Sequence, residues 1–268
     1  MFRCKQFTVV QDKCAMKVNT DSLILGSWAE PGSAKHILDV GTGSGILALM
    51  MAQKSEHFFH SSTDEQRVDN QRAVRIDAIE IDEDAAAQAA LNFKNSKWAN
   101  QLFSRCCDVN SFISPYLYDV VISNPPYFDS PAKFSNAYNQ QSQPRNLARQ
   151  TLALGTEEFF EVSYELLELN GHLYCVYPFS LEARVIQIAA SHSFALERQL
   201  YVRHVSNSAP YLCAFHFRKL AISSTLSSIE NVGVITEEAS KTTLTIRDAQ
   251  GNYTSEYKAL CQPFYLKF

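Results

Sequence analysis

A proline-rich corner after an apolar run carries groups that could do chemistry on an amine. Residues 123–128 read SNPPYF and directly follow YDVVI. A strand cannot continue through Pro125, which has no N–H to donate, so Asn124 and Tyr127 stand on a rigid corner at a strand end. The Asn124 side chain and the Pro125 carbonyl offer two acceptors for a planar NH2 group, and Tyr127 offers a ring for stacking. The alternative is a turn that only stiffens the strand exit.

A glycine-rich turn supplies a second element. Residues 38–45, LDVGTGSG, place Asp39 before Gly41, Gly43 and Gly45. Glycines at a strand-to-helix turn allow positive φ and let backbone N–H groups approach a ligand closely. The spacing is not the G-x-G-x-x-G of dinucleotide enzymes. The acid would repel a pyrophosphate, but it suits a ligand with a cationic amine and a sulfonium, such as S-adenosylmethionine. A merely tight turn is the other interpretation.

Two further acids stand at the ends of neighbouring apolar runs. Glu80, in DAIEID, can accept from both hydroxyl groups of a ribose, as an acid does in nucleotide-binding α/β folds. Asp82 competes for this role but is better placed to cap the next helix. Asp108, at the end of RCCDV, is placed to accept from the amino group of adenine, with a surface turn acid as the alternative.

The elements that position these residues alternate between strand and helix. The pattern predicts an α/β fold with a doubly wound, Rossmann-like, seven-stranded sheet, mostly parallel with a terminal antiparallel strand pair. Ligands of such sheets bind beyond the carboxyl ends of the strands, so Asp39, Glu80, Asp108 and Asn124 are expected to share one crevice. Strands are expected at 36–41, 75–81, 101–109, 118–124, 172–178, 196–205 and 211–219, and helices at 44–54, 83–98, 156–170 and 180–193.

Residues 1–268 are interpreted as one domain with two additions. Residues 53–74 are expected to form a flexible insertion, since most of this stretch is too poor in aliphatic side chains to pack. Residues 221–268 are expected to form a C-terminal extension that holds a strand, a turn and a short helix.

Composition bounds the class of protein. The longest apolar run is far too short to span a bilayer, so a cytoplasmic protein without membrane contact is expected. Seven cysteines without a CxxC pair, and no His at ligand spacing, predict neither disulfides nor a metal site. Residues 1–20, 131–150 and 198–219 together carry +10, so the net charge of −4 leaves −14 for the remainder. This distribution fits a basic face on an acidic body, or chance clustering.

The glycine loop DVGTGSG and the NPPY corner resemble those of class I S-adenosylmethionine-dependent methyltransferases that modify amino groups. Such signatures occur in adenine-N6, guanine-N2 and glutamine-N5 enzymes. The segments FTVVQDKCAMKVNTDSLILGSWA, NPPYF and NYTSEYKALCQPFYLKF resemble the bacterial tRNA1(Val) (adenine-N6)-methyltransferase family, over nearly the whole chain. The resemblance implies methyl transfer from S-adenosyl-L-methionine to N6 of the adenosine 3′ of the anticodon in a valine tRNA.

The resemblance also implies roles for single residues. Residues 1–35 would cover the cofactor from the N-terminal side, with Thr20 in contact with it, although Thr20 could instead only cap the helix that follows. For an RNA substrate, the acid-free loop at 131–150, directly after the NPPY corner, is where the anticodon stem is expected to bind, and Tyr127 and Phe128 could hold the flipped base. The expected residues are Asn124, Pro125 and Tyr127 for catalysis; Thr20, Asp39, Gly41, Gly43, Gly45, Glu80, Asp108 and Asn124 for the cofactor; and Phe128, Lys133, Arg145 and Arg149 for RNA.

Two other functions stay open at this point. A glutamine-N5 protein methyltransferase is expected to carry a helical substrate domain before the glycine loop, and too few residues precede Asp39 for one. A non-catalytic subunit that presents RNA to a partner would have no use for the NPPY corner. The sequence predicts no oligomeric state.

Overall fold

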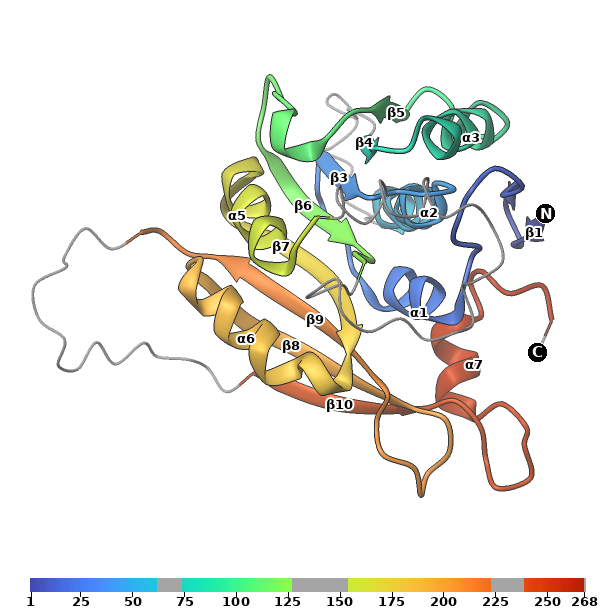
Figure 1. Cartoon of the computed structure of the whole chain (residues 1–268). Helices are drawn as coiled ribbons and strands as arrows, with labels where there is room; N and C mark the ends of the chain where they lie inside the picture. Colours follow the sequence, from blue (N-terminus) through green and yellow to red (C-terminus); the bar gives the residue numbers. More distant parts are fainter. Residues whose placement is uncertain (62–73, 127–153, 223–238, 268) are drawn as a thin grey trace, which may run out of the picture.

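The apolar runs and one polar strand assemble into a central sheet of eight strands in the computed structural model (Figure 1). The structure describes residues 1–61, 74–126, 154–222 and 239–267. The order across the sheet is β10-β8-β9-β7-β6-β3-β4-β5. The strands are β3 (His36–Val40), β4 (Arg75–Glu80), β5 (Leu102–Cys106), β6 (Tyr118–Ser123), β7 (Leu167–Pro178), β8 (Phe194–Arg203), β9 (Leu212–Lys219) and β10 (Ser240–Thr245).

The sheet confirms the doubly wound, mostly parallel prediction, but it has eight strands rather than seven. Strands β5, β4, β3, β6 and β7 are parallel to one another, and β9 is antiparallel to both β7 and β8. The eighth strand, β10, lies in the expected C-terminal extension and pairs in parallel with β8. Its residues 240–243 are exposed and polar, a composition that suits a sheet edge, and they cover the backbone groups of β8.

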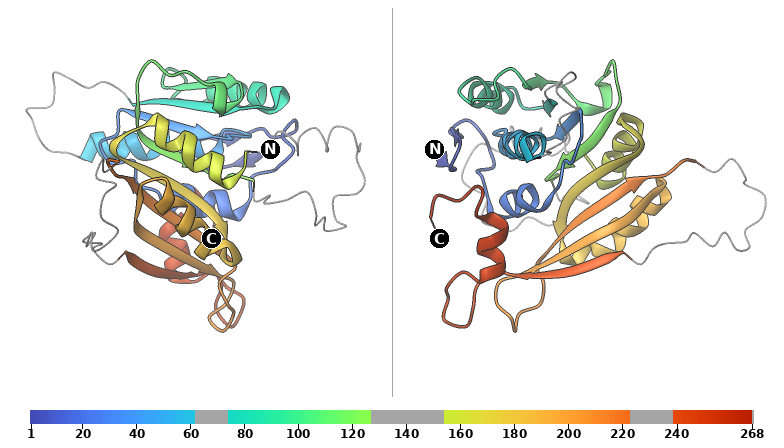
Figure 2. Two further views of the ribbon diagram at one scale, coloured as in Figure 1. Left: turned by 60° about the vertical axis from the view of Figure 1, so that its left-hand side comes forward. Right: turned by 180° about the vertical axis from the view of Figure 1, so that it is seen from behind.

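Helices cover both faces of the sheet (Figures 1 and 2). One core lies under α1, α2, α3 and α7, and the other lies under α5 and α6. Seven consecutive residues of α1 are buried, because this helix packs against α2, α7 and β7. The helices are α1 (Thr20–Trp28), α2 (Ile46–Ser61), α3 (Glu83–Lys94), α5 (Thr156–Leu166), α6 (Glu182–Ser191) and α7 (Ser255–Cys261), with 3-10 turns η2 (Val109–Ser111) and η4 (Phe179–Leu181) and a separate ribbon of β1 (Phe2–Arg3) and β2 (Thr8–Val9).

Several element boundaries differ from the sequence-based prediction; α3, for example, ends at Lys94 instead of residue 98. Two of the differences have a clear cause. Helix α5 ends at Leu166 instead of residue 170, because Leu167 already pairs with Tyr118 and starts β7. Helix α2 continues to Ser61 and so enters the segment predicted as an insertion. Its buried Gln53 donates from Nε2 to the carbonyl of Pro263 at 3.0 Å, which anchors this part of the helix to the C-terminal segment. None of the described helices is long and apolar enough to cross a membrane.

Candidate active site

Four neighbouring strands bring their carboxyl ends to one edge of the sheet. In register, Asp39 of β3 lies between Ala78 of β4 and Ile122 of β6, and Glu80 pairs with Cys106 of β5. The chain adds β4 and β5 on one side of β3 and then β6 on the other, so the direction of winding reverses between β3 and β6. This is the topological switch point, where open α/β sheets bind their ligands.

The glycine loop joins β3 to α2 at this edge. Gly41 and Gly43 have φ of +68° and +56°, a region that favours glycine. The N–H groups of Gly41 and Thr42 both donate to the carbonyl of Ile79, at 2.9 and 3.0 Å, which fixes the loop against β4. A Cβ atom on Gly41 or Gly43 would meet no heavy atom within 4 Å, so these residues leave backbone accessible to a ligand.

Gly45 is required for a different reason. Its φ is +83°, and a Cβ atom there would lie 2.4 Å from Cε1 of Phe93 on α3. We therefore expect Gly45→Ala to lower the free energy of unfolding by about 2–4 kcal/mol, from backbone strain and overpacking together. Urea denaturation would measure this. Gly32→Ala is the matched control: its φ is +55° but its surroundings are open, so the loss should be about 1 kcal/mol. Equal losses would refute the contribution of Phe93.

Asp39 is fully buried between the loop and the first turn of α2. Its Oδ2 accepts hydrogen bonds from Thr42 Oγ1 and from the N–H of Ala48, the latter at 3.1 Å. Its Oδ1 is buried and has no hydrogen-bond partner within the described part of the chain. Burial raises the pKa of Asp39 to about 7, against the opposing effect of the two hydrogen bonds. Oδ1 is thus a strong acceptor for a donor or cation that reaches this edge.

Glu80 ties the end of β4 to the glycine loop. Its Oε2 accepts from the N–H of Gly43 at 2.9 Å, and its Oε1 accepts from the N–H of Asp82 at 3.0 Å. Each oxygen keeps a second lone pair, so hydroxyl groups of a ligand can still be bound. Asp82 caps α3 through the N–H of Ala85, as the sequence predicts.

Asp108 lies after β5, at the same edge, and is half-buried. Its Oδ1 accepts from the N–H of Asn110 at 3.0 Å and caps η2. This contact fits the turn-acid interpretation and leaves its other oxygen for a ligand; its role toward adenine stays a prediction.

Asn124 is held by a residue that the sequence analysis did not single out. Its Nδ2 donates to Oγ of Ser22 on α1 at 2.8 Å, and the neighbouring Ser123 donates from Oγ to the carbonyl of Val40 at 2.7 Å. These bonds fix the strand exit against α1 and β3. The cap of α1 is Asn19, whose Oδ1 accepts from the N–H of Ser22 at 2.9 Å. Capping by Thr20 is therefore wrong; Thr20 is the exposed first residue of the helix.

Asn92 on α3 joins the N-terminal segment to the glycine loop. Its Nδ2 donates to the carbonyls of Val10 and Ser44 at 2.7 and 2.8 Å, and its Oδ1 accepts from the N–H of Val10 at 2.9 Å. The segment before α1 thus lies beside the candidate site. No local motif marks this role, because an Asn inside a helix carries no signal of the distant segment that it contacts.

Comparisons with known proteins decide the family. Residues 14–141 match the family model of the Methyltransferase small domain. The chain is 36% identical over 276 residues to the tRNA1(Val) (adenine(37)-N6)-methyltransferase of Christiangramia forsetii, covering 99% of this chain and 98% of the relative. It is also 36% identical to the protein of that name from Pseudoalteromonas atlantica, covering 100% and 98%. The chain belongs to the tRNA1(Val) (adenine(37)-N6)-methyltransferase family.

The fold agrees with this membership. A predicted O-methyltransferase from Agrobacterium tumefaciens superimposes with a TM-score of 0.59 over 91% of this chain and 96% of that one, at 15% identity. The structure brings Asp39, Glu80, Asp108 and Asn124 to the ends of neighbouring strands, as the sequence analysis expects. Tyr127, Phe128, Lys133, Arg145 and Arg149 lie outside the described residues.

Proposed function

We propose that this protein transfers a methyl group from S-adenosyl-L-methionine to the exocyclic N6 amine of an adenosine in tRNA. The observation that carries the proposal is the placement of a glycine loop, a buried acid and the Asn124–Pro125 corner at one switch point of the sheet. Membership of a family named for this activity supports it. We further propose the finer substrate that the relatives are named for, adenosine 37 of a valine tRNA, and a cytoplasmic site of action.

The residues at the switch point fit S-adenosyl-L-methionine. The Oδ1 of Asp39, which has no partner among the described residues, suits its cationic amine. The open space at Gly41 and Gly43 lets a ligand approach the N-terminus of α2, which suits its carboxylate. In our proposal Glu80 accepts from the ribose hydroxyl groups and Asp108 from the adenine amino group. Thr20, at the exposed start of α1, completes the set of cofactor contacts with Gly45 and Asn124.

When bound, the cofactor supplies an electrophilic sulfonium methyl group. Asn124 and the Pro125 carbonyl are proposed to accept from the two N–H groups of the target amine. These acceptors draw the amine nitrogen toward tetrahedral geometry and free its lone pair from the ring. The bond to Ser22 holds the Asn124 amide in place, so little reorganisation is needed. Such positioning can lower a barrier by ~7–11 kcal/mol without a strong base.

The RNA contacts in the proposal lie beyond the Asn124–Pro125 corner. Tyr127 and Phe128 would stack on the flipped adenine, and Lys133, Arg145 and Arg149 would contact phosphates of the anticodon stem-loop. Phosphate contacts of this kind fix the register of the RNA, while the corner selects the base.

The test incubates the purified protein with methyl-labelled S-adenosylmethionine and, in separate reactions, with unmodified total tRNA and with a release factor. The products are digested to nucleosides or amino acids. Label in N6-methyladenosine is expected. Label in N5-methylglutamine would keep the amine chemistry and overturn the substrate. Binding of the cofactor without transfer to either substrate would favour the non-catalytic subunit.

A further inference from the structure

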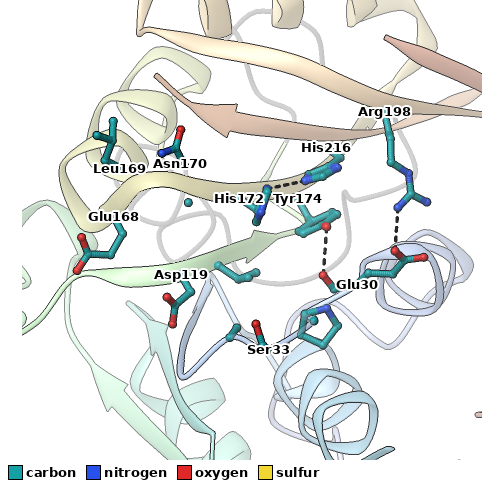
Figure 3. Close-up of a pocket in the computed structure, with 15 residues that line it drawn as sticks. Glu30, Ser33, Asp119, Glu168, Leu169, Asn170, His172, Tyr174, Arg198 and His216 are labelled. Carbon is teal, nitrogen blue, oxygen red and sulfur yellow. Dashed lines mark hydrogen bonds and ion pairs between the residues drawn. The ribbon is translucent and has the colours of Figure 1, made fainter. Parts of the chain in front are cut away.

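Two histidines and a glutamate meet on the central sheet, toward the end of its strands that lies opposite to the candidate active site. His172 lies near the start of the regular pairing of β7, Glu197 lies on β8, and His216 lies on β9, which runs antiparallel to both. His172 and His216 also line a cavity of about 440 Å³ beside the loop between α1 and β3 (Figure 3). The glycine loop lies at the other end of β3, so this cluster takes no part in the proposed methyl transfer.

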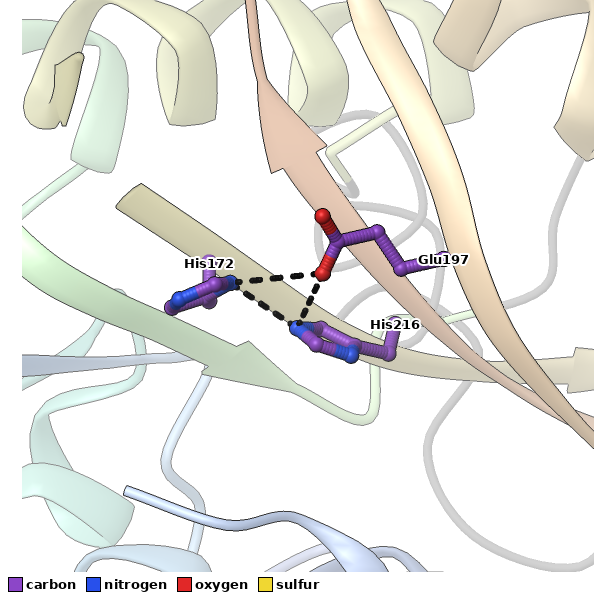
Figure 4. A group of neighbouring side chains, drawn as sticks. All are labelled: His172, Glu197 and His216. Carbon is purple, nitrogen blue, oxygen red and sulfur yellow. Dashed lines mark hydrogen bonds and ion pairs between the residues drawn. The ribbon is translucent and has the colours of Figure 1, made fainter. Parts of the chain in front are cut away.

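The three side chains point toward one another (Figure 4). Nδ1 of His172 lies 2.9 Å from Nε2 of His216, and Oε2 of Glu197 lies 3.9 and 3.6 Å from these two nitrogens. Ligand atoms at the corners of a tetrahedral zinc site lie ~3.3 Å apart, given metal–ligand bonds near ~2.0–2.1 Å. The observed separations lie on either side of this value, so small side-chain movements would form three corners of such a site.

The sheet register explains how the cluster arises. His216 pairs with Tyr174 of β7 and with Arg198 of β8, so these side chains share a face with His172, two residues before Tyr174. Regular alternation would send Glu197 to the opposite face. The register shifts between Leu196 and Arg198, however, and a bulge at this point turns the Glu197 side chain toward the histidines.

Neighbouring groups hold two of the three ligands, Glu197 and His216, in place. The guanidinium of Arg218 donates from Nε to Oε1 of Glu197, which orients Oε2 toward the histidines. The ring of His216 stacks on Tyr174 with a centroid separation of 4.3 Å. His216 is only 8% exposed, so the surrounding side chains fix its ring in place.

The cavity supplies access and a favourable charge. Its lining includes the carboxylates of Glu30, Asp119 and Glu168 and one guanidinium, that of Arg198, which is held by Glu30 at 3.1 Å. Apart from the two histidines, the charged side chains of the lining sum to −2. A divalent cation would therefore be attracted to the cavity. The His172 side chain is 39% exposed, so an ion in the cavity could reach the cluster from this side.

We propose that His172, Glu197 and His216 bind one divalent transition-metal ion, with Zn²⁺ the best match, through Nδ1, Oε2 and Nε2. Two imidazoles and one carboxylate are a donor set that zinc accepts, with three protein ligands and a fourth position open to solvent. The fourth position would face the cavity. The ion would cross-link strands β7, β8 and β9. Sequence spacing gives no sign of the site, because its ligands come from three strands rather than from one motif.

The test titrates the untagged, chelator-treated, full-length protein with Zn²⁺ in a competition assay against a chromophoric chelator, with Co²⁺ as a spectroscopic probe. We expect one Zn²⁺ per chain, Co²⁺ absorption bands of low-coordinate N/O ligation, and a higher Tm with the metal. His172→Gln and Glu197→Gln should each weaken Zn²⁺ binding by more than about tenfold. Circular dichroism and the Tm without metal verify that the variants fold.

His204→Gln is the matched control, since His204 is exposed and stacks on Tyr211 outside the cluster. It should bind Zn²⁺ as the wild type does. Two results would overturn the proposal: no stoichiometric binding by the wild type, or equal binding by wild type, His172→Gln and Glu197→Gln. The second result would assign the metal to other groups, such as the exposed thiol of Cys106.

Discussion

Replacing Asn124 with alanine is expected to lower the turnover number for methyl transfer by on the order of 10²–10³-fold, the loss typical of removing one fixed hydrogen-bonding group from a reacting centre. The variant lacks one of the two acceptors proposed for the amine protons. Cofactor affinity should change by less than about threefold, because Asn124 is only one of the proposed cofactor contacts and Asp39 and the glycine loop remain intact. Single-turnover rates with saturating tRNA and calorimetric titration with S-adenosylmethionine measure the two quantities separately.

Ser22→Ala separates two effects of removing Asn124: the loss of an acceptor for the target amine and the loss of a structural hydrogen bond to α1. Asn124 donates to Ser22 at 2.8 Å, so the alanine variant of Asn124 also loses a tie between the strand exit and α1. If that tie were all that mattered, Ser22→Ala would lower turnover as much as Asn124→Ala does. We expect it to lower turnover by roughly tenfold or less, since the acceptor itself stays in the site. Equal losses, or a near-normal rate for Asn124→Ala, would refute the role assigned to Asn124.

The sequence predicts those parts of the site that depend on residue type within a short stretch of chain. Asp39, Glu80 and Asn124 each end a strand, and the rule that parallel strands share their carboxyl edge then brings them together. Gly41 and Gly43 are recognisable because positive φ at a strand-to-helix turn is a property of a few consecutive residues. For such features, chain order and residue type are sufficient.

Contacts between distant segments carry no such signal. Ser22 and Asn124 are 102 residues apart, and Asn92 reaches Val10 across 82 residues. Each is an ordinary polar residue in its own helix or turn, and only the packing of α1 and α3 beside the sheet gives it a partner. The same holds for Glu197, whose direction depends on a bulge.

Edge and boundary errors have a related cause. Strand β10 reads as an isolated polar strand, and its place beside β8 depends on an open sheet edge that the sequence does not display. Residues 167–170 continue the helical pattern of α5, yet Leu167 pairs with Tyr118 of β6 and begins β7. Tertiary pairing decides the partner of β10, and at residues 167–170 it outweighs the local helical pattern.

Asp39→Asn is expected to weaken binding of S-adenosylmethionine by roughly 10- to 100-fold, the loss typical of a hydrogen bond to a charged partner. The substitution keeps the side-chain shape and one oxygen for Thr42 and Ala48, but it replaces the unpartnered buried oxygen with an amide nitrogen. Asp119→Asn is the control. That carboxylate accepts from the N–H groups of Lys35 and His36 at the opposite end of β3, at 2.8 and 2.9 Å, and its loss should leave cofactor affinity unchanged.

The raised pKa of Asp39 adds a dependence on pH whose sign follows from linkage. The folded protein keeps a proton on this carboxyl up to about pH 7, whereas the unfolded chain releases it near 3.8. Between these values the folded state binds more protons, so the free energy of unfolding without cofactor should fall as pH rises through this window. Urea midpoints at pH 5 and pH 8 should show this fall in the wild type and a smaller one in Asp39→Asn.

Cofactor binding should show the opposite trend, because a cationic ligand favours the ionised carboxylate. Between pH 6 and pH 7 the wild-type affinity should rise roughly fivefold as Asp39 ionises, while the affinity of Asp39→Asn should stay flat. Calorimetry in buffers of different ionisation enthalpy should detect a proton released on binding to the wild type alone. A pH-independent wild-type affinity, or the same profile in both proteins, would show that Asp39 does not face the cationic group and acts only as the anchor of the glycine loop.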